Sequence, residues 1–239
     1  MPNPTAAMLV IGDEILSGRT HDANTYHLAG ALSAAGIDLR EARVVSDDSD
    51  AIIAAVQALS SAYDHVFTSG GIGPTHDDIT ADAVARAMGR SIDVREDARA
   101  ILAAHYDKSG TELNEARLRM ARIPEGATLI DNPVSAAPGF VIGNVHVMAG
   151  VPAIFRAMVA SALPSLTGGA PLMSRGLDVY RGEGDVAAPL AELAARYPQL
   201  TFGSYPFQRD GVHGTNVLAR GQDSAALDAA LAEMSELFG

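Results

Sequence analysis

Cysteine is absent from the 239-residue sequence, and lysine occurs only at Lys108. Without cysteine the chain can form no disulfide, no thiolate zinc site and no iron–sulfur cluster, and it has no thiol nucleophile. The sequence also lacks any run of about 18 apolar residues and any basic segment that leads into an apolar core at the N-terminus. We therefore expect a cytoplasmic protein that neither enters nor crosses a membrane.

Positive charge is scarce as well. The formal net charge is −12 and the isoelectric point is near 4.9, which argues against nucleic acid as a partner because binding its backbone requires clustered lysine and arginine. An acidic protein can still bind a phosphate-bearing small molecule where backbone amides, a few arginines or a divalent cation offset the repulsion.

Several common catalytic motifs are missing. The sequence has no P-loop, no Gly-x-Gly-x-x-Gly turn, no Gly-x-Ser-x-Gly elbow and no His-Glu-x-x-His helix. Their absence weakens the interpretation of this chain as an ATPase, a dehydrogenase, a serine hydrolase or a zinc protease.

The stretch from Val66 to Thr80 joins a short apolar segment to a helical pattern through three glycines, Gly70, Gly71 and Gly73, followed by Pro74. Glycine permits a positive φ and a close approach of the backbone to a bound group. We interpret the stretch as a strand, a phosphate-sized turn and a helix start; a plain structural turn is the alternative. The phosphate interpretation predicts that Gly71→Ala weakens ligand binding while the stability of the fold stays nearly unchanged.

Two adjacent carboxylates, Asp77 and Asp78, follow this turn. We expect the segment from Thr75 to Asp78 to cap the next helix and to lie near the positive end of its dipole. Side chains of consecutive helical residues diverge by about 100°, so both carboxylates cannot cap the same amides and one is available for chemistry. His76 lies beside them, although a lone loop histidine is more often a surface residue than a base.

Strand, loop and helix patterns alternate along the first part of the chain. Strands are expected at 6–11, 39–45 and from Val66, each followed by a helical pattern. This order predicts an α/β fold with a parallel, doubly wound sheet, in which ligands bind at the carboxyl ends of the strands. Asp13 and Glu14 follow the first strand, where they are either ligand contacts or solvated loop residues. Asp47 and Asp48 follow the second strand and are expected to be a solvated helix cap.

The later part of the chain contains further elements. Helices are expected at 96–106 and 112–122, a strand at 127–130, a hairpin of 140–142 with 145–148, and a helix that begins near Pro152. Arg117, Arg119 and Arg122 form either a solvated helix face or a group that reaches a substrate phosphate. The Gly/Pro-rich segment 166–175 is expected to link a domain of residues 1–165 to a small α+β domain of residues 176–239.

Four motifs together resemble the molybdopterin-binding domain of the MoaB/Mog type. They are Gly12-Asp13-Glu14-Ile15-Leu16-Ser17-Gly18 with Asn24-Thr25, the segment 69–80, Ala137-Pro138-Gly139-Phe140, and Gly150-Val151-Pro152. Their order is similar, more narrowly, to the N-terminal domains of competence/damage-inducible protein A (CinA) and of eukaryotic FAD synthase. The resemblance implies a three-layer α/β fold with a mainly parallel sheet, a pocket at the Gly-Gly-x-Gly turn and a homo-oligomer.

The resemblance also implies site residues and three possible activities. Asp77 and Asp78 match the acidic pair of the family, while His76 stands where many CinA proteins have lysine. The molybdenum-cofactor branch binds or adenylylates molybdopterin, whereas the CinA-like branch is associated with metal-dependent cleavage of ADP-ribose or FAD. A non-catalytic nucleotide- or pterin-binding module is the third possibility.

Of these activities we expect the metal-dependent cleavage of a dinucleotide-like pyrophosphate. Asp78, Asp77 and Glu14 are the expected ligands of Mg²⁺, Mn²⁺ or Co²⁺, and His76 is the expected proton carrier beside the catalytic pair Asp77 and Asp78. The residues expected to bind the substrate are Gly70, Gly71, Gly73, Pro74, Thr75, Asp13, Glu14, Asn24, Pro138 and Gly139.

Overall fold

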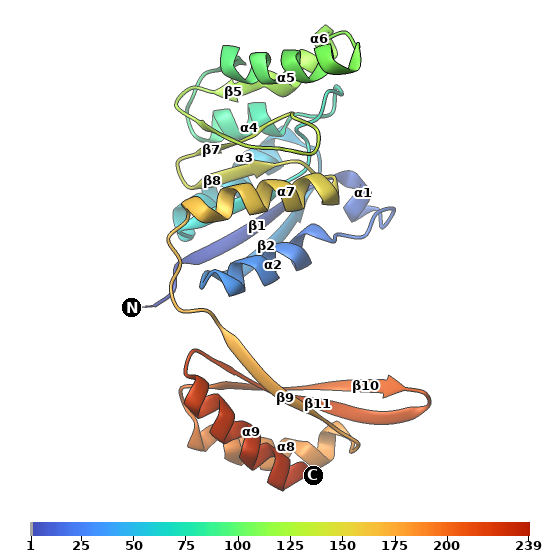
Figure 1. Cartoon of the computed structure of the whole chain (residues 1–239), viewed down its shortest axis with the longest axis vertical. Coiled ribbons are helices and arrows are strands. Elements are labelled where there is room, and N and C mark those ends of the chain that lie inside the picture. Colours follow the sequence, from blue (N-terminus) through green and yellow to red (C-terminus); the bar gives the residue numbers. More distant parts are fainter. Residues whose placement is uncertain (1) are drawn as a thin grey trace. The chain divides into compact units, whose positions relative to one another are not determined.

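The computed structural model describes residues 2–239, which form two compact units. The first unit ends at Gly169, and the second extends from Ala170 to Gly239. The division falls inside the segment 166–175 that was expected to be a linker, and strand β9 (Met173–Val179) begins within the same segment. Figure 1 shows the elements of both units along the chain.

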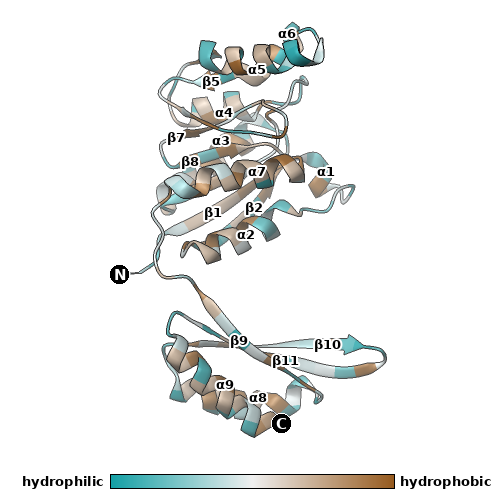
Figure 2. Ribbon diagram, viewed as in Figure 1, coloured by the Kyte–Doolittle hydropathy of each residue, from teal (hydrophilic) through white to brown (hydrophobic). Residues whose placement is uncertain are grey.

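The first unit contains most of the helices and strands. In chain order they are β1 (Thr5–Ile11), α1 (Asp13–Leu16), α2 (Asn24–Ala34), β2 (Asp38–Val45), α3 (Ser49–Ala62), β3 (His65–Ser69), α4 (Thr80–Ala87), β4 (Ile92–Val94), α5 (Glu96–Ser109), α6 (Glu115–Leu118), the 3-10 helix η1 (Arg119–Ala121), β5 (Arg122–Pro124), β6 (Thr128–Ile130), β7 (Gly139–Ile142), β8 (Val145–Met148), α7 (Pro152–Ala162) and the 3-10 helix η2 (Leu163–Ser165). Strand β1 is largely apolar, whereas the short helix α6 is hydrophilic (Figure 2).

A six-stranded sheet of order β2-β1-β3-β8-β7-β6 forms the centre of this unit. Strands β2, β1, β3 and β8 are parallel to one another, and β7 is antiparallel to both of its neighbours. The expected hairpin is therefore present as β7 and β8, which are joined by Gly143 at φ 58° and Asn144. The sheet is mainly parallel, as the sequence predicted.

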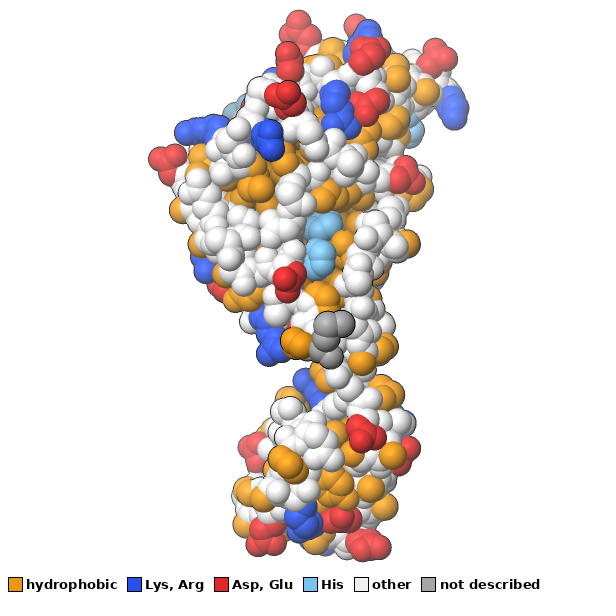
Figure 3. Space-filling view, turned by 90° about the vertical axis from the view of Figure 1, so that its left-hand side faces the viewer, with side chains coloured by type: hydrophobic (Ala, Val, Ile, Leu, Met, Phe, Trp, Pro, Cys, Tyr) orange, Lys and Arg blue, Asp and Glu red, His pale blue; other side chains and the backbone are white. Residues whose placement is uncertain are grey.

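Strands β3 and β8 bring two histidines together at the end of the sheet where β3 begins. His65 Nδ1 and His146 Nε2 lie 3.4 Å apart, and the His146 ring stacks on Phe67 with 4.7 Å between ring centroids. Histidine side chains gather in the middle of the face drawn in Figure 3. Burial, and then the charge of His65, lower the pKa of His146 to about 4.

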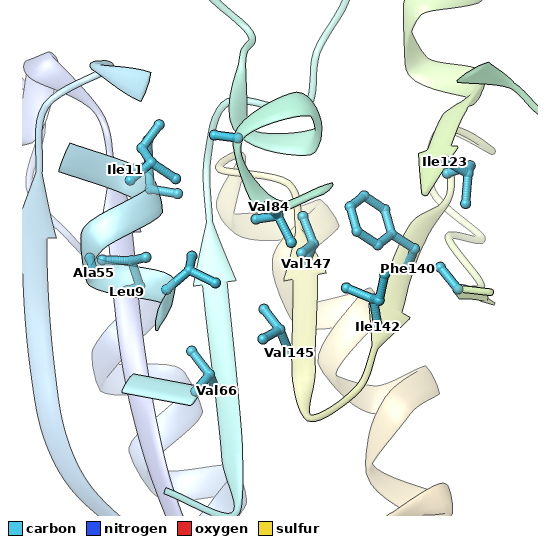
Figure 4. Close-up of a cluster of buried hydrophobic side chains, with 14 of the residues drawn as sticks. Leu9, Ile11, Ala55, Val66, Val84, Ile123, Phe140, Ile142, Val145 and Val147 are labelled. Carbon is cyan, nitrogen blue, oxygen red and sulfur yellow. The ribbon is translucent and has the colours of Figure 1, made fainter. Parts of the chain in front are cut away.

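Helices cover both faces of the sheet. Because side chains alternate along a strand, the odd-numbered residues of β1 from Ala7 to Ile11 pack with α3 and α4, and the even-numbered residues from Ala6 to Val10 pack with α2 and α7. Figure 4 shows the first of these two clusters, in which side chains of β1, β3, β7 and β8 face a common core. The unit is thus a three-layer α/β fold, as expected.

Two parts of the first unit differ from the sequence prediction. The single helix expected at 112–122 is instead α6, η1 and strand β5, which pairs with β4. Asn114 caps the short helix by accepting a hydrogen bond from the backbone N–H of Arg117, and Pro124 cannot continue a helix. The loop expected after β1 begins with the short helix α1.

The second unit is a small α+β domain, as predicted. Its elements are β9, α8 (Glu183–Arg196), β10 (Thr201–Arg209), β11 (Val212–Gly221) and α9 (Ser224–Phe238). The strands form an antiparallel sheet of order β10-β11-β9, and a separate core joins the sheet to the two helices. Within residues 2–239, no helix has both the length and the apolar character needed to span a bilayer.

Candidate functional site

A cavity of about 500 Å³ lies where β1, β3 and β8 end, at the carboxyl edge of the parallel strands. This is the edge at which open α/β sheets bind ligands, and the volume suits a small organic molecule. Its lining residues come from four segments: Glu14 and Thr20 after β1; Gly70, Gly71, Ile72, Gly73, Pro74 and Asp78 after β3; Met120, Asn132, Ser135 and Ala137 before β7; and Ala149, Gly150, Val151, Pro152 and Ile154 after β8.

The glycine turn after β3 presents free backbone donors to this cavity. Gly70 and Gly71 have φ values of 110° and 68°, in the region that favours glycine. Gly70 donates its N–H to Met148 O at 3.2 Å, but among residues 2–239 the N–H groups of Gly71, Ile72 and Gly73 donate to no other residue. Three consecutive unpaired donors on a cavity wall suit an anionic ligand.

The close packing around Gly71 changes the prediction made for its alanine variant. A Cβ at this position would lie 2.1 Å from Thr80 Oγ1, and its φ of 68° strains any L-residue with a side chain. The expectation that Gly71→Ala leaves stability nearly unchanged is therefore wrong. Gly73 is different, because its φ is unstrained and its added Cβ would first meet the Asp78 carboxylate, with Oδ2 at 2.6 Å.

The N-terminus of helix α7 forms another wall of the cavity. Pro152 occupies its first turn, and Val151 at the N-cap makes no side-chain cap hydrogen bond. Both residues line the cavity together with Ile154. The first amides of a helix have no intrahelical acceptor and carry the positive end of its dipole, so this wall also favours an anion.

Asp78 lines the cavity, but it does not cap the next helix. Its Oδ2 accepts hydrogen bonds from the Thr75 backbone N–H at 2.8 Å and from the Thr75 hydroxyl. Helix α4 begins at Thr80 after Ile79, without a side-chain cap, so the expected cap between Thr75 and Asp78 is not present. The carboxylate closes the loop on itself instead, because the chain needs two more residues before it can turn into the helix.

Asp77 and His76 lie outside the cavity. Their side chains are 65% and 99% exposed, and His76 Nδ1 is 3.9 Å from Asp77 Oδ1. Of the three residues expected to be catalytic, the structure therefore places only Asp78 on the cavity wall.

Negative charge accumulates beside Glu14. Asp47 Oδ2 accepts a hydrogen bond of 2.9 Å from the backbone N–H of Asp13, so Asp13 meets Asp47 rather than the cavity. Burial raises the pKa of Asp47, and the nearby charges of Asp13, Glu14 and Asp77 raise it further. Asp48 caps α3 by accepting from the N–H of Ala51 at 2.9 Å, which is the role expected for it.

The carboxylates that line the cavity suit a small divalent cation that prefers oxygen ligands. Among residues 2–239, no three histidine, aspartate or glutamate side chains are placed to hold a metal ion by themselves. Two carboxylates, Glu14 and Asp78, line the same cavity. That set fits Mg²⁺ or Mn²⁺, which commonly bind one or two carboxylates and complete their shell with water and substrate phosphate oxygens.

The remaining predicted substrate-binding residues hold the walls in place. Asn24 is buried and donates from Nδ2 to Ser69 Oγ and to Gly150 O, at 2.7 Å each. A Cβ on Gly139 would lie 2.4 Å from Val147 O, so this glycine allows β7 and β8 to approach. Pro138 lines a smaller cavity next to the main one.

Asn132 and Ser135, on the wall formed before β7, were not among the residues expected from the sequence. Asn132 is buried and donates from Nδ2 to Ser135 Oγ at 2.7 Å and to Ala137 O at 2.8 Å, while its Oδ1 accepts from the N–H of Val134 and Ser135. These bonds hold Ala136 at a φ of 63°. The sequence signals for this wall were the motif Ala137-Pro138-Gly139-Phe140, whose Ala137 lines the cavity, and the Asn132-Pro133 dipeptide, which does not distinguish a cavity wall from a surface loop.

Comparisons with known proteins agree with this fold. Residues 7–168 match the family described as "Probable molybdopterin binding domain", and residues 171–239 match the family described as "FAD synthase, middle domain". The crystal structure of the protein CinA with unknown function from Thermoplasma acidophilum is 36% identical, with a TM-score of 0.62, and covers 68% of this chain and 97% of that chain.

Two curated relatives extend over more of the sequence. A CinA-like protein of Desulfosudis oleivorans is 35% identical over 83% of this chain and 51% of its own length. A "Probable FAD synthase" of Caenorhabditis briggsae is 31% identical over 98% of this chain and 49% of its own length. The chain thus spans about half the length of these relatives. It belongs to the molybdopterin-binding domain family of the MoaB/Mog type and is similar to CinA-like proteins and FAD synthases.

Proposed function

We propose that this protein hydrolyses the pyrophosphate bond of a dinucleotide-like substrate, such as ADP-ribose or FAD, with the help of a divalent cation. One observation carries the proposal: unpaired amides, a helix N-terminus and two carboxylates line the same cavity. Amides alone would suit any anion, but carboxylates beside them would repel a phosphate unless a cation lay between them.

The substrate phosphate is bound by this chain's own donors. The N–H groups of Gly71, Ile72 and Gly73 face no protein acceptor, so they can donate to phosphate oxygens without breaking an existing hydrogen bond. The first amides of α7 add their dipole from the neighbouring wall. These fixed donors stabilise the charge on the phosphate as the bond to the leaving group breaks.

Asp78 and Glu14 are the residues that would hold the cation. When bound, Mg²⁺ or Mn²⁺ polarises a phosphoryl oxygen and lowers the pKa of a bound water. Asp78 keeps a fixed position because Thr75 donates two hydrogen bonds to the same carboxylate oxygen. Asp77 and His76 face solvent, and we place them at the rim of the site, where they can take up the released proton.

The similarity to a protein named FAD synthase supports a flavin dinucleotide as one candidate substrate. The second candidate function is the binding or adenylylation of molybdopterin, which the name of the matched family favours. Incubation with ADP-ribose, with FAD, or with ATP plus molybdopterin, each with a divalent cation or with EDTA, separates the two candidates. Release of AMP supports hydrolysis, adenylylated pterin supports the second candidate, and tight binding without turnover supports a ligand-binding module.

A further inference from the structure

Two further cavities lie beside the main one. The smaller one, the neck, has a volume of about 10 Å³ and shares Gly73, Asp78 and Met120 with the main cavity. It also shares Asp82, Arg119 and Arg122 with a cavity of about 420 Å³, whose walls include Val94, Glu115 and Leu118.

Arg119 lies where the neck meets the far cavity. Its Nη2 donates to the backbone O of Asp78 at 3.2 Å, and its Nε is buried without an acceptor among residues 2–239. No carboxylate in this part of the chain lies within ion-pair distance of its guanidinium, whereas the neighbouring Arg122 pairs with Asp82 at 2.5 Å. In a protein with a net charge of −12, an arginine that lines a cavity and forms no ion pair is suited to bind an anionic ligand.

We propose that Arg119 binds a second phosphate group of the substrate and thereby makes the site selective for ligands with two linked phosphates. This inference rests on the proposed function, since the first phosphate is the one at Gly71 to Gly73. The contact to Asp78 O fixes the guanidinium next to the residue that would hold the cation.

Titration calorimetry with ADP and AMP in the presence of Mg²⁺ tests this proposal. The single phosphate of AMP is expected to bind the N–H groups of Gly71 to Gly73. Only ADP then has a second phosphate that Arg119 can bind. We expect the intact protein to bind ADP more tightly than AMP, and Arg119→Gln to lose about 10-fold or more in affinity for ADP while its affinity for AMP stays nearly constant. Arg119→Lys is the second variant, for the case that Arg119→Gln folds poorly. It keeps the positive charge but lacks the planar guanidinium, so its affinity for ADP should lie between those of the intact protein and Arg119→Gln.

Arg117→Gln is the matched control. Its guanidinium lies 5.0 Å from the centre of the Tyr106 ring and donates to Glu112 O, away from the neck. This variant should bind both nucleotides as the intact protein does. Equal affinities of the intact protein for ADP and AMP, or an unchanged preference for ADP in both Arg119 variants, would overturn the proposal. Calorimetry measures binding and does not depend on turnover. Absence of ADP-ribose turnover would therefore refute the proposed hydrolysis without changing the result for Arg119.

Discussion

The side chain of Asn24 donates a hydrogen bond of 2.7 Å to the carbonyl oxygen of Gly150. Its Nδ2 also donates to Ser69 Oγ at the end of β3. One buried amide thus connects the start of α2 with the glycine turn after β3 and the segment that leads into α7. Because those two segments carry the free amides of the cavity, Asn24 fixes the distance between its walls.

Replacing Asn24 with alanine should therefore affect both stability and binding. The hydroxyl of Ser69, a buried residue, and the carbonyl oxygen of Gly150 would lose their donor, which costs about 1 to 3 kcal/mol in free energy of unfolding, and the affinity for ADP should fall several-fold. Asn144→Ala is the control, because Asn144 Nδ2 also donates to two backbone oxygens, those of Ser60 and Tyr63, and none of these three residues lines the cavity. Denaturant titration should show destabilisation of both variants, and calorimetry should show weaker binding for the Asn24 variant alone. Equal affinity in both variants would contradict this role.

Gly73→Ala tests the glycine turn better than Gly71→Ala. The added Cβ displaces the Asp78 carboxylate without straining the backbone, so the expected loss of unfolding free energy is that of the hydrogen bonds from Thr75, about 1 to 3 kcal/mol. Binding of ADP and turnover should both weaken, because the loop no longer holds Asp78 on the cavity wall. Melting curves and calorimetry on the same samples check this, and a variant that binds and reacts like the parent would show that the turn is only structural.

The buried histidine predicts a dependence of stability on pH. An unfolded histidine titrates near 6.5, whereas burial lowers the pKa of His146 in the folded protein to about 4. The unfolded state therefore binds the proton first, and the stability that is present above pH 6.5 is lost as the pH falls toward 4. The complete shift corresponds to about 3 kcal/mol.

His146→Phe keeps an aromatic ring beside Phe67 and removes the titrating group. Between pH 7 and pH 5 this variant should lose about 2 kcal/mol less unfolding free energy than the parent does. His105→Phe, at an exposed position on α5, should follow the parent at both pH values. Identical losses in the parent and the His146 variant would mean that other groups control the acid sensitivity.

The sequence predicted the fold well where local pattern and tertiary structure agree. Strand β1 is a continuous, buried apolar segment, and the β7–β8 hairpin has its turn at Gly143-Asn144. The prediction failed at 112–122, where helical residues are divided between a short helix, a 3-10 turn and an edge strand. Residues 122–124 form a strand because they pair with β4. Pairing between segments distant in sequence leaves no periodic pattern in either segment alone.

The candidate site was predictable only in part. Glycines and a following acidic residue located the turn, because positive φ values and a strand end are local features. The sequence could not show that Asp77 and His76 are exposed while Asp78 lines the cavity, because the conformation of the loop orients adjacent residues differently and no residue pattern records it. Arg119 and Asn132 reach the cavity from segments distant in sequence, and only the folded chain brings them there.

The most direct test of the proposed hydrolysis is the rate of AMP release from ADP-ribose and FAD by the parent and by Asp78→Asn, measured with Mg²⁺, Mn²⁺, Co²⁺ or EDTA. The asparagine oxygen can still accept from Thr75, so the loop should keep its shape. The proposal predicts release that requires a divalent cation and falls at least about 100-fold in Asp78→Asn, with a much smaller decrease in Asp77→Asn. Release that is absent with every cation, or equal in the parent and Asp78→Asn, would contradict it.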